Sequence, residues 1–259
     1  MTKVNLPIYQ NMLLTIYRLI RNTGVLKTRS GFALFQFFYD TYKNILEARS
    51  IHQLKNFGGL GTTIIDVGAN TGFFTRHFSD WVGIEGQVIS IEPEQINFDY
   101  LKESNDRRSA LQNVDYFKAA VCDIDGSVNL VINLDHPGDH HLGDTGDIVN
   151  AITLDSFLEK GLKNSVSLIK IDVQGAEYKV IDGARKLIQK HRPNLFIEVD
   201  NAALERMKTT PKAIFLLLAE MGYSIKYFDR KKLVGPISAE EAVTRTKLIS
   251  YSDYLFVPN

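Results

Sequence analysis

The chain has 259 residues, and its 30 Lys and Arg residues balance its 30 Asp and Glu residues, so the formal net charge is zero. A neutral chain has no overall field that favours nucleic acid, an anionic membrane or an acidic substrate, and we expect no nucleic-acid partner. The length suits one α/β domain with an added smaller unit and leaves little room for two full domains. The single cysteine, Cys122, excludes an internal disulfide, which favours a reducing, cytoplasmic location and a packing role for this thiol.

Residues 1–60 have the pattern of a helical arm or cap. Leu13, Ile16 and Ile20 recur with the period of a helix. The apolar run from Met12 to Tyr17 stops at Arg18, is too short to span a bilayer, and is not followed by a small-residue cleavage pattern. We therefore predict no transmembrane segment and no export signal, and we expect the arm to pack on the main body or to join two copies of the chain in a homo-oligomer.

From residue 61 onward, short apolar runs alternate with helical segments. Runs rich in β-branched and aromatic residues predict strands at 62–66, 87–91, 116–121, 167–172 and 194–199. Helical patterns lie between or after them, at 73–82, 97–105, 176–190 and 211–221. This alternation predicts right-handed crossovers and a doubly wound, mostly parallel α/β sheet of the Rossmann type over residues 61–259.

The end of the chain has a different pattern. Two strand-like runs, 223–229 and 251–257, are joined by a polar stretch without a good helical pattern. These runs predict an antiparallel hairpin at the C-terminal edge, which would bring the sheet to seven strands.

The first strand leads into a glycine-containing loop. Asp66 ends the strand, and Gly68 and Gly72 bracket the three residues that follow. Glycines permit a positive φ and let the backbone approach a ligand closely, while the next helix presents unpaired N–H groups. Asp66 can order the loop or accept a hydrogen bond from an ammonium group. The pattern indicates a nucleotide-type ligand, although a plain βα turn would contain the same glycines.

Glu92 narrows the choice of ligand. It ends the second strand at the interval from Gly72 that is expected of an acid that binds a ribose diol. A dinucleotide loop would have a glycine where Asn70 stands, and no Walker lysine follows Gly72. Enzymes that use NAD share the ribose acid, so an NAD-dependent oxidoreductase remains an alternative. A solvated glutamate at a strand end is the other interpretation of Glu92.

A second strand-turn-helix motif occupies residues 168–177. Asp172 lies at the carboxyl end of the strand, Gly175 permits the turn, and Glu177 falls in the first helical turn, where the helix dipole favours an anion. The two acids can cap and orient the helix. Alternatively, Asp172 belongs to an active site beside the loop at 66–72.

In this order, the motifs resemble the FkbM family of class I methyltransferases. The family pattern consists of Asp-x-Gly-x-Asn-x-Gly, an acid-Pro pair, Thr-Leu-Asp, and Ile-Lys-Ile-Asp-Val-Glu-Gly-x-Glu. The matching residues are Asp66, Gly68, Asn70 and Gly72, then Glu92 and Pro93, then Thr153 to Asp155, and finally Ile169 to Glu177. The likeness covers residues 62–258. One position departs from the family: Gln174 stands where a glutamate is usual, which puts in doubt any role of that glutamate, including metal ligation.

The resemblance implies that S-adenosylmethionine is the cofactor and that a hydroxyl on a saccharide or secondary metabolite is the acceptor. It places the methionine end near Asp66, Gly68, Asn70 and Gly72, the ribose on Glu92, and the adenine near the segment from Ala120 to Asp123. A non-catalytic binding protein that retains the fold is a further alternative.

Candidate catalytic groups are Asp172 and two histidines, His140 and His141, in the loop at 135–144. Methyl transfer requires alignment above all, and a base within hydrogen-bond distance would assist a hydroxyl acceptor. Histidine can act as a base near neutral pH. The spacing of these residues matches no standard metal site, so we predict no metal. A polar surface loop with no catalytic role is the alternative for the histidines.

Overall fold

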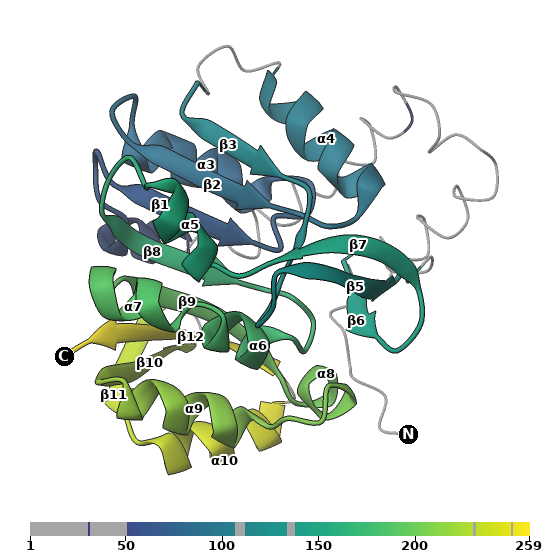
Figure 1. Ribbon diagram of the computed structural model, residues 1–259. Helices are drawn as coiled ribbons and strands as arrows, with labels where there is room; N and C mark the ends of the chain where they lie inside the picture. Colours follow the sequence, from purple (N-terminus) through teal and green to yellow (C-terminus); the bar gives the residue numbers. More distant parts are fainter. Residues whose placement is uncertain (1–30, 32–50, 107–111, 134–137, 230–231, 250) are drawn as a thin grey trace.

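A computed structural model describes Gly31 and residues 51–106, 112–133, 138–229, 232–249 and 251–259 (Figure 1). Most of the helical arm predicted at residues 1–60 therefore lies outside the described residues, as do residues 134–137 of the histidine loop. Within 51–60, helical residues 51–54 lead into the 3-10 helix η2 (Lys55–Phe57).

The main sheet is mixed and has eight strands. They are β1 (Thr63–Val67), β2 (Gln87–Ile91), β3 (Val114–Phe117), β8 (Val166–Ile171), β9 (Asn194–Asp200), β10 (Tyr223–Asp229), β11 (Lys232–Ile237) and β12 (Tyr251–Pro258). Their spatial order is β11-β10-β12-β9-β8-β1-β2-β3. Neighbouring strands from β9 to β3 pair in parallel. The predicted doubly wound α/β organisation is thus present, with β1 at the centre of the five parallel strands.

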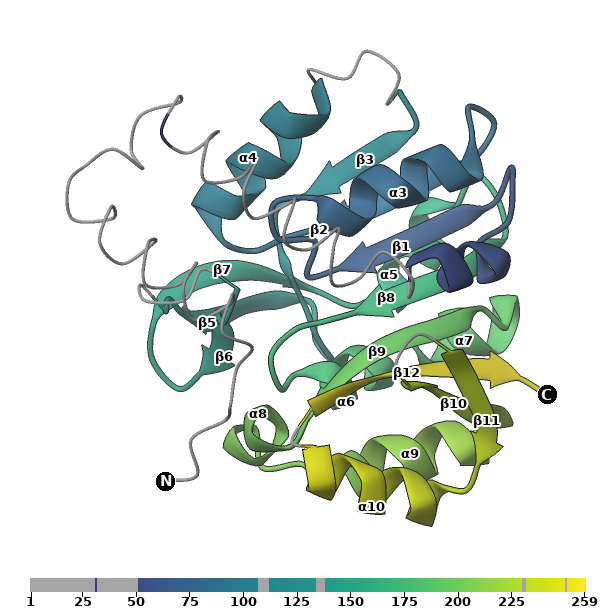
Figure 2. The ribbon, with the colours of Figure 1, turned by 180° about the vertical axis from the view of Figure 1, so that it is seen from behind.

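Helices cover both faces of this sheet. They are α3 (Phe73–Val82), α4 (Gln95–Asp106), α5 (Asp155–Lys160), α6 (Glu177–Asp182), α7 (Arg185–His191), α8 (Asn201–Arg206), α9 (Pro211–Glu220) and α10 (Ala239–Ile249). Side chains alternate across the strands, so Ile64 packs with α3 whereas Ile65 packs in the larger core beneath α6, α7 and α9. Figure 1 shows α6 and α7 on one face, and Figure 2 shows α3 on the other.

The predicted helix at 176–190 is two helices, α6 and α7. The chain breaks at Gly183, where an added Cβ atom would lie 2.1 Å from the carbonyl oxygen of Cys122. This close approach of two backbone segments is a tertiary contact, and the helical pattern of the sequence does not contain it.

A second, four-stranded sheet lies beside the carboxyl ends of β1, β2 and β8 (Figure 1). It contains β4 (Ala120–Val121), β5 (Gly126–Val131), β6 (His141–Gly143) and β7 (Asp147–Ile152), in the order β4-β7-β5-β6. The single strand predicted at 116–121 is divided between the two sheets. Its partner β2 ends at Ile91, which pairs with Phe117, so the chain beyond that residue pairs with β7 instead.

The C-terminal edge also differs from the prediction. β10 and β12 pair antiparallel, but β12 lies between β9 and β10, and the edge strand is β11. The sheet consequently has eight strands instead of seven. β11 contains Gly235 and Pro236. In the sequence this pair is typical of an interruption between strands, but it is tolerated in a strand at a sheet edge. Helix α10 was missed because its only fully buried residues, Ala242 and Thr246, form a narrow stripe on a polar helix.

Candidate active site

The loop between β1 and α3 depends on two glycines with positive φ. Gly68 has a φ of 72°, and an added Cβ atom would lie 1.9 Å from the carbonyl oxygen of Asp172. Gly72 has a φ of 85° and precedes α3. The N–H groups of Gly68 and Ala69 both donate to the carbonyl oxygen of Ile91, each at 3.0 Å. The backbone of this loop therefore touches the ends of β2 and β8, which is the close approach that the glycines suggested.

Asp66 lies beneath the loop and is fully buried. The hydroxyl of Thr75 donates to its Oδ2 at 2.6 Å, and the ammonium of Lys170 lies 3.5 Å from its Oδ1. Burial raises the pKa of Asp66, and the positive charge of Lys170 opposes that rise. Because it has no exposed surface, Asp66 orders the loop and is not placed to contact a ligand directly.

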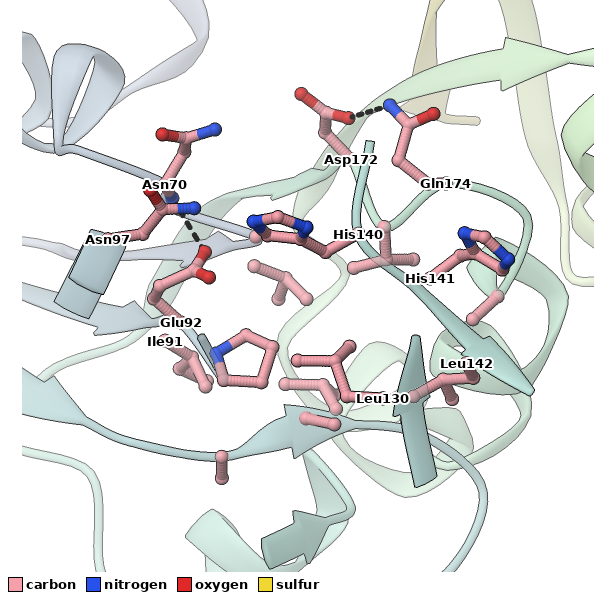
Figure 3. Close-up of a pocket in the computed structure, with 18 of the residues that line it drawn as sticks. Asn70, Ile91, Glu92, Asn97, Leu130, His140, His141, Leu142, Asp172 and Gln174 are labelled. Carbon is pink, nitrogen blue, oxygen red and sulfur yellow. Dashed lines mark hydrogen bonds between the residues drawn. The ribbon is translucent and has the colours of Figure 1, made fainter. Parts of the chain in front are cut away.

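An open cavity of about 610 Å³ lies between the carboxyl ends of the main strands and the second sheet (Figure 3). Seven of the ten predicted site residues line it: Gly68, Asn70, Glu92, Ala120, His140, His141 and Asp172. Three do not. Asp66 lies beneath the glycine loop, and Gly72 lies at the end of the loop, just before α3. Asp123 forms a partly exposed ion pair with Lys179 at 3.5 Å.

Glu92 enters the cavity from the end of β2. The backbone N–H of Asn70 donates to its Oε2 at 2.8 Å, and the N–H of Glu94 donates to its Oε1 at 3.0 Å. The side chain is only 5% exposed, and burial raises its pKa to about 7 despite these two hydrogen bonds. Glu92 is thus a buried acid that is oriented by the glycine loop, and it is not a solvated strand-end residue.

Asp172 faces the cavity from the loop after β8. Lys170 lies 3.3 Å from its Oδ2, and the side-chain amide of Gln174 donates to its Oδ1 at 3.3 Å (Figure 3). Glu177 accepts hydrogen bonds from the N–H groups of Val173 and Gly175, at 3.3 and 3.0 Å, and burial raises its pKa to about 7. Glu177 therefore shapes the turn, while Asp172 presents a carboxylate to the cavity.

The two histidines line the cavity in different hydrogen-bonding states. The backbone N–H of Asn133 donates to Nδ1 of His140 at 3.1 Å, so the proton of the neutral ring is on Nε2. Nδ1 of His141 lies 3.4 Å from the carbonyl oxygen of Asp139, which can only accept, so a neutral ring that makes this hydrogen bond has its proton on Nδ1 and leaves Nε2 as an acceptor. His141 is consequently the better placed proton acceptor, and His140 is a hydrogen-bond donor.

Several residues at this site were not among those predicted from sequence. Leu130 and Leu142 come from β5 and β6 and add an apolar wall, and Asn97 lies beside Glu92 (Figure 3). Lys170 lies below the cavity floor and is 4% exposed. Of these, Lys170 had a usable signal, because a lysine inside an otherwise apolar strand needs a buried partner.

The other predictions concern metals, the thiol and the membrane. Among the residues that the structure describes, no group of three or more His, Cys, Asp or Glu side chains is arranged to hold a metal ion. Cys122 is buried in the small core of the second sheet, and burial raises its pKa. No helix within the described segments has both the length and the apolar character needed to cross a bilayer.

Fold and site together define an α/β methyltransferase-like protein with a ligand cavity at the carboxyl ends of its parallel strands. The family model for the methyltransferase FkbM domain matches residues 66–225, so the chain belongs to the FkbM methyltransferase family. The prediction from the four sequence motifs is thereby confirmed. No curated protein matches the chain.

Solved structures with a similar fold include three methyltransferase-like proteins. The FkbM methyltransferase of Methylobacillus flagellatus KT is 17% identical, with a TM-score of 0.46 over 75% of this chain and 43% of its own. A SAM-dependent methyltransferase of Aquifex aeolicus is 15% identical, with a TM-score of 0.43 and coverages of 80% and 88%. Fibrillarin of Aeropyrum pernix, solved with bound S-adenosyl-L-methionine, is 14% identical, with a TM-score of 0.45 and coverages of 80% and 73%. The chain spans less than half of the Methylobacillus protein, and the family assignment rests on the domain match.

Proposed function

We propose that this chain transfers a methyl group from S-adenosylmethionine to a hydroxyl of a saccharide or secondary metabolite. The observation that carries the cofactor assignment is the Glu92 carboxylate, which two backbone N–H groups hold at the cavity wall beside the glycine loop. Such a carboxylate can accept two hydrogen bonds from a ribose diol. Gly68 supports the same assignment, because its missing Cβ lets the loop lie directly against Asp172.

The residues around the cavity can hold each part of this cofactor. Glu92 would bind the ribose, and the apolar surface of Ile91, Pro93 and Ala120 would take the adenine. The loop from Gly68 to Asn70, with Asp172 opposite, would take the methionine end. When bound, S-adenosylmethionine supplies an electrophilic methyl group on a sulfonium sulfur.

The chain's own residues would orient the acceptor and receive its proton. Leu130 and Leu142 would contact the apolar part of an acceptor. As the hydroxyl oxygen bonds to the methyl carbon, the bond from that carbon to the sulfonium sulfur would break and leave S-adenosylhomocysteine, while the hydroxyl proton would pass to Nε2 of His141 or to the Asp172 carboxylate. Orientation can lower such a barrier by about 7–11 kcal/mol, so these residues need only modest basicity.

Calorimetric titration of the full chain with S-adenosylmethionine, S-adenosylhomocysteine and NAD tests the cofactor. Radiolabelled methyl transfer to a panel of saccharides and hydroxylated metabolites tests the reaction. Glu92→Gln should abolish binding of the methyl donor, whereas Glu159→Gln, on the exposed side of α5, is the matched control. Binding of NAD without the methyl donor would establish the oxidoreductase alternative, and donor binding without transfer would favour a non-catalytic binding protein.

A further inference from the structure

We infer that Lys170 and Gln174 are positioning residues that hold the Asp172 carboxylate from two sides and tie it to the glycine loop at Gly68. The inference rests on the proposed function, because it treats the cavity beside Asp172 as the cofactor site. Lys170 and Gln174 belong to the motif at 168–177, but neither was predicted as a site residue from the sequence.

The ammonium of Lys170 joins the two loops of the site. Its Nζ donates to the carbonyl oxygen of Gly68 at 3.1 Å and lies 3.3 Å from Oδ2 of Asp172. It also lies 3.5 Å from Oδ1 of the fully buried Asp66. A buried lysine is tolerated only when such acceptors compensate its lost hydration. A partner for Asp66 alone would not need the contacts to Gly68 and Asp172, and these contacts connect the loop after β1 with the loop after β8.

Gln174 holds the other oxygen of the same carboxylate. Its Nε2 donates to Oδ1 of Asp172 and to Oε1 of Glu198, both at 3.3 Å. Its φ of 53° lies in the left-handed region, which is unfavourable for a residue with a side chain. The neutral amide therefore separates two carboxylates as a donor to both. A glutamate at this position would bring only acceptors to the same place and would repel both neighbours.

Loss of the Lys170 contacts and loss of the Gln174 contacts should affect different loops. Lys170 couples the glycine loop to Asp172, so its loss should loosen both loops. Gln174 hydrogen-bonds to Asp172 in the loop after β8 and to Glu198, so its loss should loosen that loop and leave the glycine loop in place. This difference gives the inference a test that does not depend on turnover.

Hydrogen–deuterium exchange of the cofactor-free full chain measures both loops. We expect Lys170→Met to speed exchange roughly 10-fold or more in segments 67–73 and 172–176, since a lost charged hydrogen bond is typically a change of that order. Gln174→Glu should speed exchange in 172–176 only. Arg185→Met is the matched control, because it removes a cation from an exposed ion pair with Asp182; it should change neither segment.

A double substitution, Asp66→Asn with Lys170→Met, tests whether Lys170 positions Asp172 or only neutralises the charge of Asp66. It removes both members of the buried pair, so the melting temperature should recover toward that of the unsubstituted chain. Exchange in 172–176 should stay fast, because Oδ2 of Asp172 still lacks the Lys170 ammonium. If exchange recovered together with the melting temperature, Lys170 would serve only to neutralise Asp66, and the inference would be wrong.

Cofactor titration of the same variants completes the test. S-adenosylhomocysteine affinity should fall roughly 10- to 100-fold in Lys170→Met and less than about threefold in Gln174→Glu. If the unsubstituted chain failed to bind S-adenosylhomocysteine, the proposed function would fail, while the exchange data would still decide the positioning roles. Unchanged exchange in 172–176 for Gln174→Glu would overturn the role of Gln174 independently.

Discussion

Replacing Glu92 with glutamine should have opposite effects on stability at low and at high pH. Burial raises the pKa of this carboxyl from 4.5 to about 7, so the folded state binds the proton more tightly than the unfolded chain. The corresponding stabilisation is fully present below the unfolded pKa of 4.5 and is lost as the pH rises through about 7. Glutamine does not titrate, so the variant lacks this dependence.

The shift in pKa sets the size of the effect. At about 1.4 kcal/mol per pKa unit, the change in unfolding free energy caused by Glu92→Gln should move by about 2 to 3 kcal/mol in favour of glutamine between pH 5 and pH 8. The amide also loses one acceptor for the N–H of Asn70 or Glu94, which costs about 1 to 3 kcal/mol at either pH. The variant should therefore be less stable than the unsubstituted chain at pH 5 and about equal to it, or more stable, at pH 8.

Urea unfolding of both proteins at pH 5 and pH 8 measures this difference, with Glu159→Gln as an exposed control expected to change stability by less than about 0.5 kcal/mol. Titration with S-adenosylhomocysteine at both pH values completes the experiment. Affinity of the unsubstituted chain should be higher at pH 8, where Glu92 is ionised and can accept from a ribose diol. An equal effect of Glu92→Gln on unfolding free energy at the two pH values would refute the reasoning.

Substitutions at four further positions separate the roles of the loop, the histidines and the scaffold. Gly68→Ala puts a methyl group 1.9 Å from a carbonyl oxygen at a φ of 72°, so urea unfolding should show a loss of about 2 to 4 kcal/mol, and calorimetry should show no cofactor binding. His141→Ala should lower kcat roughly 100-fold with little change in cofactor affinity, whereas loss of the donor His140 should cost less, as measured by methyl transfer at saturating donor. Arg192→Met removes hydrogen bonds to the carbonyls of Met221 and Gly222, at 2.5 and 2.9 Å; unfolding free energy should fall by about 1 to 3 kcal/mol while cofactor affinity stays constant.

The sequence alone was sufficient for the strand-loop-helix units that carry the site. Helix α3 has the predicted bounds, and β1 is shifted by one residue. These elements have local signals: apolar runs, glycines that need a positive φ, and a proline at the first position of α9. Gly68, Asn70, Glu92 and Asp172 meet at one cavity because parallel strands bring their carboxyl ends to the same edge of the sheet.

The second sheet could not be predicted in the same way. β5, β6 and β7 are short and half exposed, and only Leu130, Leu142 and Ala151 among their residues are buried. Too few apolar positions remain to define a period of two. Their burial arises from contact with Ala120, in β4 of the same sheet, and with Ala176, which precedes α6 and is distant in sequence. The apolar wall of the cavity is therefore a product of long-range packing.

The buried acids of the site explain why its two loops are held so closely. Asp66, Glu92 and Glu177 are each at most 5% exposed, and burial raises the pKa of all three. Each acid accepts hydrogen bonds from the turn or helix that follows a strand, so the unfavourable burial of charge orders the backbone around the cavity. Only Glu92 also lines the cavity, so a ligand that donates to it would stabilise its ionised form and offset part of that burial cost. Asp66 and Glu177 do not line the cavity, so a ligand there cannot donate to them, and their role is to stabilise the loops. Glu92 is therefore the acid through which ligand binding and proton binding are coupled.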